Sequence, residues 1–174
     1  MITIRPATAS DADALPAIER ASGALFRGWP GLEWIADDGV QSAEKHRELI
    51  AQGIALVAVE DGRPVAFLNA ELTDDDALHI WQIAVELLHQ RQGIGRRLIE
   101  AACVIAETLG AQALTLTTFR DVPWNEPYYR RLGFGLIAAD DLSPRLRSIL
   151  DREALAGLPP ERRCAMKLPL KAAP

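Results

Sequence analysis

The chain has 174 residues, of which 49% are hydrophobic and 25% charged, and its net charge at pH 7 is −5. This size and composition are typical of a single globular domain with a sizeable core, and we expect residues 1–174 to form one. The acidic balance argues against a nucleic-acid-binding surface and permits a cationic or amine substrate. No apolar run is long enough to span a membrane, and the first residues lack the order of a secretory signal, so we expect a cytoplasmic protein without a membrane partner.

Cysteine and histidine are too sparse to suggest a crosslinked or metal-bound framework. Cys103 and Cys164 lie far apart without CxxC spacing, and the three histidines lack HExxH spacing. We expect two buried free thiols in a reducing compartment and predict no metal site.

Hydrophobic patterns and turn signals predict a mixed sheet with helices. In chain order they indicate a strand over 2–5, helices over 12–20 and 42–52, strands over 54–60, 64–72 and 78–85, a helix over 94–109, a strand over 113–119, a short helix over 128–132, and closing strands over 134–138 and 163–168 around a helix over 143–156. Residues 21–40 hold glycines and aromatics without a clean period, which favours a loop or a short irregular helix. The order of elements indicates an α/β fold with one mixed sheet and helices on both faces.

The most informative local motif is residues 89–97, His-Gln-Arg-Gln-Gly-Ile-Gly-Arg-Arg, which join a predicted strand to a predicted helix. Two glycines one residue apart let backbone N–H groups turn inward, and the helix start adds a positive dipole end, as in a pyrophosphate cradle. Arg91, Arg96 and Arg97 add positive charge. A Rossmann fingerprint needs a third glycine and a later acidic residue, and a Walker loop needs Gly-Lys-Ser/Thr, neither of which occurs here. From the loop alone, a plain strand-to-helix turn remains the alternative.

Taken together, the strand over 78–85, the Gln-x-x-Gly-x-Gly loop and Tyr-x-x-x-Gly-Phe at 129–134 resemble the GNAT superfamily of acyl-CoA-dependent N-acyltransferases. Ile-Arg-Pro at 4–6 and the Asp-Gly hairpin support the resemblance, which covers roughly residues 2–138. It implies a central, mostly antiparallel sheet of about six to seven strands, splayed at the cofactor strand. The loop is locally most similar to that of arylalkylamine N-acetyltransferases.

The resemblance implies acetyl-CoA as the acyl donor, with its pyrophosphate on the loop and its pantetheine arm beside the preceding strand. The Val85 N–H, eight residues before Gly93, is expected to polarise the thioester carbonyl. For Asn125 a bond to the pantetheine or to the tyrosine loop and a plain turn-forming role beside Pro127 stay open. The residues expected to contact the cofactor are Ile83, Ala84, Val85, Gln90, Arg91, Gln92, Gly93, Ile94, Gly95, Arg96 and Asn125.

Tyr129 is the predicted catalytic acid, because it matches the family's tyrosine four residues before Gly133. An unperturbed phenol, with a pKa of about 10, stays protonated at neutral pH and can reprotonate a departing thiolate. Tyr128 is the competing assignment, and packing beneath the cofactor is the structural alternative for Tyr129.

His79 is the predicted proton acceptor, because it aligns with the first histidine of the arylalkylamine enzymes' His-Leu-His strand. Trp81 stands at the second histidine, so a two-histidine relay is absent. A lone strand histidine is more often a hydrogen-bonded structural residue, which remains the alternative. Gln82 replaces a glutamate found in many members and cannot act as a base, while Glu71 is a further candidate base.

The predicted function is therefore direct acetyl transfer to a primary amine, with a small molecule as the first choice of acceptor. Four aromatic residues are expected either to wall an acceptor pocket or to pack in the core: Phe26, Trp29, Trp34 and Trp124. A protein N-terminus or lysine is the alternative acceptor. A non-catalytic acyl-CoA-binding regulatory module and a purely structural domain are the alternative functions, and a homodimer stays open.

Overall fold

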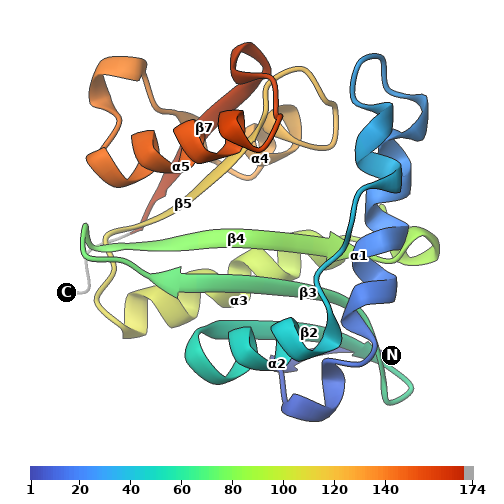
Figure 1. Cartoon of the computed structure of the whole chain (residues 1–174). Coiled ribbons are helices and arrows are strands. Elements are labelled where there is room, and N and C mark those ends of the chain that lie inside the picture. Colours follow the sequence, from blue (N-terminus) through green and yellow to red (C-terminus); the bar gives the residue numbers. More distant parts are fainter. Residues whose placement is uncertain (171–174) are drawn as a thin grey trace. The chain divides into compact units, whose positions relative to one another are not determined.

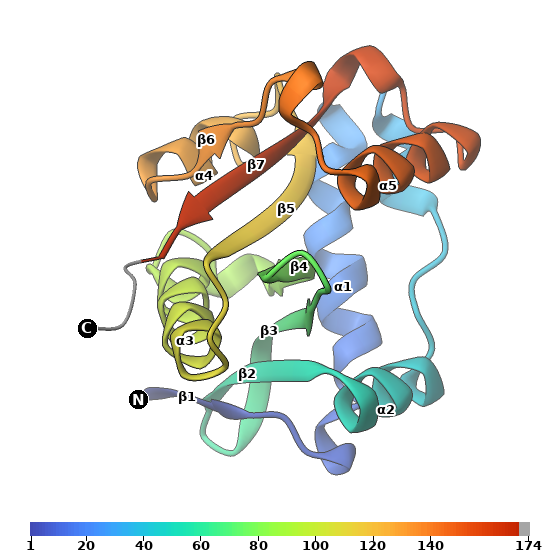
Figure 2. The same cartoon turned by 90° about the vertical axis from the view of Figure 1, so that its left-hand side faces the viewer.

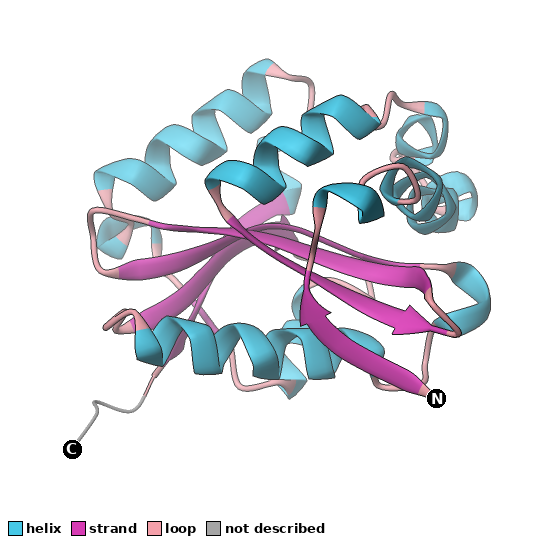
Figure 3. Cartoon of the chain, turned by 90° about the horizontal axis from the view of Figure 1, so that it is seen from below, coloured by secondary structure: helices cyan, strands magenta, loops and turns pink. Residues whose placement is uncertain are grey.

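The computed structural model describes residues 1–170 and contains both strands and helices (Figure 1). Figure 3 distinguishes the helices from the strands by colour. The strands are β1 (Ile2–Pro6), β2 (Ile54–Glu60), β3 (Arg63–Leu72), β4 (Ala77–Val85), β5 (Ala113–Phe119), β6 (Gly135–Leu136) and β7 (Arg163–Pro169). The α-helices are α1 (Leu15–Gly23), α2 (Ala43–Gln52), α3 (Ile94–Thr108), α4 (Glu126–Arg131) and α5 (Pro144–Leu155).

The strands form one seven-stranded sheet in the order β1-β2-β3-β4-β5-β7-β6. Most of its pairs are antiparallel, and β4 and β5 run parallel. This confirms the predicted mixed, mostly antiparallel sheet. The chain divides into two compact units, the first made of Met1–Glu71 and Gln82–Val104, the second of Leu72–Trp81 and the described residues from Ile105 on. A single functional domain over residues 1–174 stays a prediction.

The first unit is built on the β1–β2–β3 meander. Asp61 and Gly62 have φ angles of 49° and 82°, the left-handed pair that a tight hairpin between β2 and β3 requires. Residues 64–70 of β3 are buried without alternation, so both faces of this strand are covered. Figure 2 shows α1 and α3 on opposite sides of β3. On the α1 side, Leu15 and Ile18 pack against strand residues that include Val57, Val59 and Phe67.

The second unit centres on β5. Its parallel pairing with β4 covers three residue pairs, from Ala77 with Ala113 to His79 with Thr115. Its antiparallel pairing with β7 covers all seven residues of β5. The helix α5 lies beside these strands (Figure 2), where Leu146 and Ile149 pack against Ala165. Within this unit the described ladder between β4 and β5 ends early, as expected for a splayed pair of strands.

Four sequence predictions need correction. The predicted strand over 134–138 shrinks to Gly135–Leu136, because the chain turns at 139–141 into a 3₁₀ turn. The predicted helix over 12–20 is a 3₁₀ turn at 9–11 followed by α1, whose first turn contains Pro16. The predicted helix over 128–132 starts earlier, at Glu126, because a proline is tolerated in the first turn of a helix. Of the two cysteines, which form no disulfide with each other, Cys164 is buried as expected and Cys103 only half-buried.

None of the helices within residues 1–170 is long and apolar enough to cross a membrane.

Candidate functional site

In the first unit, the glycine loop forms a tight turn from β4 into α3. Arg91 and Gly93 have φ angles of 60° and 77°, and α3 starts at Ile94. The side chain of Gln90 donates a hydrogen bond of 3.0 Å to the carbonyl of Val85, which ties the loop to the end of β4. This bond brings together Val85 and Gln90, two of the residues predicted to contact the cofactor.

The loop has the properties of an anion-binding turn. The first N–H groups of a helix lack intrahelical partners, and the helix dipole adds a partial positive charge at the same point. A Cβ atom built on Gly93 would meet no atom within 4 Å, so the outer side of this residue is open. The side chains of Arg91, Gln92 and Arg96 are exposed, although Arg96 also pairs with Glu100 at 2.7 Å. These features fit a phosphate-bearing ligand.

The first unit also contains a cavity of about 240 Å³ beside the second half of β4. Its walls come from α1, from the segment between α1 and α2, and from β4. Both polar and apolar side chains line it, and they include Glu19, Arg20, Asp38, Gln82, Phe26, Ile35, Val40 and Ile83.

Of the predicted aromatic wall residues, Phe26 lines this cavity. Trp34 is 42% exposed, and Trp29 and Trp124 are half-buried. Glu71, the further candidate base, lies exposed at the end of β3.

In the second unit, Tyr129 is held in α4 with its ring buried. The ring makes edge contacts with Tyr128 and Phe134, at centroid distances of 5.3 Å and 5.7 Å. Burial raises the pKa of its phenol well above the ordinary value, and the neighbouring Tyr128 adds to the shift. The phenol is therefore protonated at neutral pH, as a proton donor must be.

Asn125 connects the end of β5 to α4. Its side-chain carbonyl accepts a hydrogen bond of 2.7 Å from the Thr118 hydroxyl, and its backbone carbonyl accepts one from the Tyr129 N–H at 3.0 Å. The side chain thus ties the start of α4 to the end of β5, and contact of Asn125 with the cofactor stays a prediction.

His79 is 1% exposed on β4. Its Nδ1 lies 2.9 Å from the Thr115 hydroxyl on β5, and its ring packs edge-on against Trp81 at 4.5 Å. Burial, together with the positive charge of Arg145, lowers the pKa of His79 to about 3, although the negative charge of Asp75 opposes the shift. The imidazole is neutral at pH 7. Its role as a base stays a prediction, and these surroundings favour the structural alternative.

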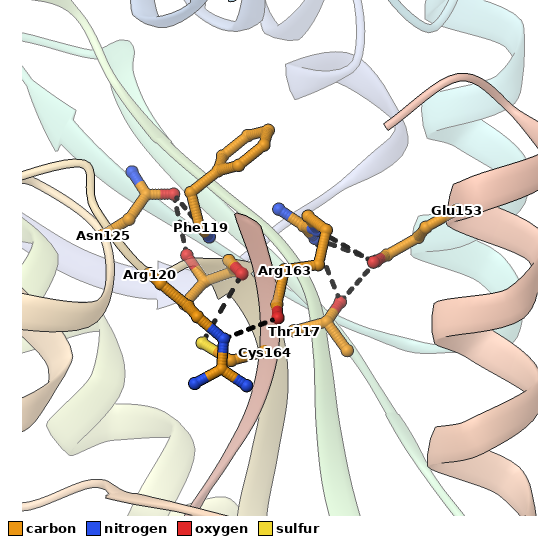
Figure 4. A network of polar contacts seen from close by, with 8 residues as sticks. Thr117, Phe119, Arg120, Asn125, Glu153, Arg163 and Cys164 are labelled. Carbon is orange, nitrogen blue, oxygen red and sulfur yellow. Dashed lines mark hydrogen bonds and ion pairs between the residues drawn. The ribbon is translucent and has the colours of Figure 1, made fainter. Parts of the chain in front are cut away.

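A polar network on β5, β7 and α5 was not found from the sequence (Figure 4). Glu153 accepts two hydrogen bonds of 2.9 Å from Arg163, and Thr117 donates to the same carboxylate. The Arg163 guanidinium also stacks 4.5 Å from the centre of the Phe119 ring. The ion pair of Glu153 and Arg163 is largely buried, since only 18% of the Glu153 side chain and 10% of the Arg163 side chain are exposed. No sequence signal separates such residues from ordinary surface charges, because their partners lie on different elements.

Comparison with known proteins gives one family and many structures of the same fold. Residues 24–134, well over half of the chain, match the Acetyltransferase (GNAT) family. The PaiA N-acetyltransferase from Thermoplasma acidophilum, solved with coenzyme A, superposes with a TM-score of 0.72 at 18% identity, over 97% of this chain and 99% of that one. A GNAT-family acetyltransferase from Staphylococcus aureus gives 0.73 at 14%, over 98% and 100%.

A third structure, a GNAT-family acetyltransferase from Brucella melitensis in complex with acetyl-CoA, gives a TM-score of 0.56 at 23% identity, over 78% of this chain and 83% of that one. Identities this low establish the shared fold alone. The family match is the stronger finding, and its residues include the glycine loop and Tyr129. The chain belongs to the GNAT family of acetyltransferases.

Proposed function

We propose that this acyltransferase moves the acetyl group of acetyl-CoA directly to the primary amine of a small molecule. The observation that supports acetyl-CoA as the acyl donor is the glycine loop, where left-handed residues Arg91 and Gly93 lead into the N-terminus of α3. Residues of this loop, from Gln90 to Arg96, would hold the pyrophosphate. Ile83 to Val85 would run beside the pantetheine arm, with the Val85 N–H directed at the thioester carbonyl. When bound, acetyl-CoA supplies an acyl group activated as a thioester.

The transfer itself requires few groups from the protein. The amine nitrogen forms a bond to the carbonyl carbon, the carbon–sulfur bond breaks, the amine loses a proton to water, and the thiolate of CoA gains one. We assign the last proton to Tyr129, whose buried phenol is protonated at neutral pH. Tyr128 stands next to it and is the alternative donor.

Direct transfer is preferred to a covalent acyl-enzyme. Nucleophilic cysteines act as thiolates. Burial raises the pKa of the Cys164 thiol to about 11, and its Sγ lies 3.6 Å from the Thr118 carbonyl. This thiol is protonated at neutral pH and is a poor acyl carrier.

A small acceptor is supported by the cavity beside β4. Its volume of about 240 Å³ lies below the range of roughly 300–1,000 Å³ typical of pockets for drug-sized ligands. Phe26 and Ile83 give it apolar walls. A protein N-terminus or a lysine side chain would also present only a small amine-bearing group to such a cavity, and these acceptors are the second candidate.

The test measures acetyl-CoA binding and acceptor-dependent release of CoA thiol. We expect acetyl-CoA to raise the melting temperature, because a ligand of the native state stabilises it. A panel of small amines should then release thiol faster than peptides with a free N-terminus or lysine. Faster release with peptides would move the acceptor to the second candidate. Binding without acceptor-dependent release would favour a regulatory acyl-CoA-binding module, and no thermal shift at millimolar acetyl-CoA would contradict the proposal.

A further inference from the structure

We propose that Glu19 is the residue that selects the ammonium group of the acceptor in the cavity beside β4. This inference rests on the proposed function, and it gives the cavity a charge preference and a specificity-determining residue. Sequence reasoning did not single out Glu19, because a carboxylate on an amphipathic helix normally faces solvent.

The first argument is the position of Glu19. It lines the cavity from α1, and only 17% of its side chain is exposed. The other charged lining residues, Arg20 and Asp38, are exposed. The sheltered charge of this cavity is therefore negative. A sheltered carboxylate interacts with a cation more strongly than an exposed one does, since less water screens it.

The second argument is that one carboxylate oxygen of Glu19 already has neighbours that restrict the side chain. Its Oε2 accepts a hydrogen bond of 3.1 Å from the backbone N–H of Gln41. The Nε2 of His46, a fully buried residue on α2, lies 3.3 Å from the same oxygen. The His46 ring is itself fixed by an edge contact with Phe67, at a centroid distance of 5.1 Å. Within the described residues the other oxygen of Glu19, Oε1, forms no hydrogen bond, so it remains available to a ligand.

The third argument concerns Gln82, the polar residue that β4 contributes to the cavity. Its side-chain carbonyl accepts a hydrogen bond of 3.1 Å from the side chain of Gln41. A glutamine has no charge, and here its carbonyl is already bonded. Gln41 therefore bridges the two cavity residues, bonding Glu19 through its backbone and Gln82 through its side chain. The cavity obtains its sheltered negative charge from α1 rather than from β4.

The experiment compares binding of amines with binding of neutral alcohols of the same shape, using the full chain at pH 7. The probe pairs are phenethylamine with phenethyl alcohol, butylamine with butanol, and alaninamide with lactamide, each followed by ligand-observed NMR. The wild-type protein should prefer the amine in at least one pair. In Glu19→Gln that preference should fall by about 10- to 100-fold, as expected for a lost hydrogen bond to a charged group.

Two further variants and one measurement make the result specific. Glu19→Asp keeps the charge and should keep part of the preference, whereas Glu44→Gln makes the same chemical change at an exposed site on α2 and should behave as wild type. No preference in the wild type, or the same preference in Glu19→Gln, would overturn the assignment. Acetyl-CoA titrations of each protein separate the two proposals. A wild-type protein that does not bind acetyl-CoA would contradict the proposed function. A wild-type protein that binds acetyl-CoA but shows no preference for amines would contradict only the role of Glu19.

Discussion

The neutral, buried imidazole of His79 makes the free energy of unfolding depend on pH. Burial lowers its pKa to about 3 in the folded chain, whereas the unfolded value is about 6.5. Between these values the unfolded chain binds a proton at His79 and the folded chain does not, so stability falls as the pH falls. The contribution is fully present above about pH 7, and the two pKa values give a loss of about 2 kcal/mol between pH 7 and pH 5.

The assay is urea unfolding of the wild type and of His79→Gln at pH 8, 7, 6 and 5. The variant cannot titrate at this position, so the wild type should lose about 2 kcal/mol more than the variant between pH 7 and pH 5. From pH 8 to pH 7 both proteins should change nearly in parallel, which serves as the internal control. Equal losses at low pH would refute the reasoning and would mean that the folded imidazole can take up a proton. That result would support the predicted role of His79 as a catalytic base.

Three further predictions concern the loop, the tyrosine and the polar network. Tyr129→Phe should lower kcat by about 100-fold with little change in acetyl-CoA affinity. If Tyr128→Phe shows this loss instead, Tyr128 is the catalytic acid. Gly93→Ala should weaken acetyl-CoA binding about tenfold in calorimetry, because a side chain is strained at its φ of 77°, and Gly28→Ala, with ordinary backbone, should not. Glu153→Gln should cost about 2 kcal/mol in urea unfolding, since its arginine partner loses a largely buried carboxylate. An unchanged midpoint would show that water replaces that contact.

The sequence predicted the fold well where a local pattern decides the structure. The turn at Asp61 and Gly62, the end of α2 at Gly53 and the start of α3 at Ile94 all depend on a few neighbouring residues. The family motifs at the glycine loop and Tyr129 likewise predicted the family, and the roles of these residues stay predictions.

Burial and partners could not be predicted in the same way, because they depend on residues distant in the sequence. His79 has the alternating position expected of a cofactor-strand residue, yet its environment is set by Thr115, 36 residues later. The sequence did not single out Glu19, because its partners Gln41 and His46 lie on later parts of the chain.

The pairing of β5 also has a consequence for the order in which the chain folds during synthesis. Parallel pairing with β4 supports only Ala113 to Thr115, while β7, which supports the whole of β5, is made of residues 163–169. Until those residues have left the ribosome, the backbone groups of residues 116–119 lack their native strand partner. We therefore expect the second unit to complete its folding late in translation, with β5 exposed to chaperones or to incorrect pairing until β7 arrives.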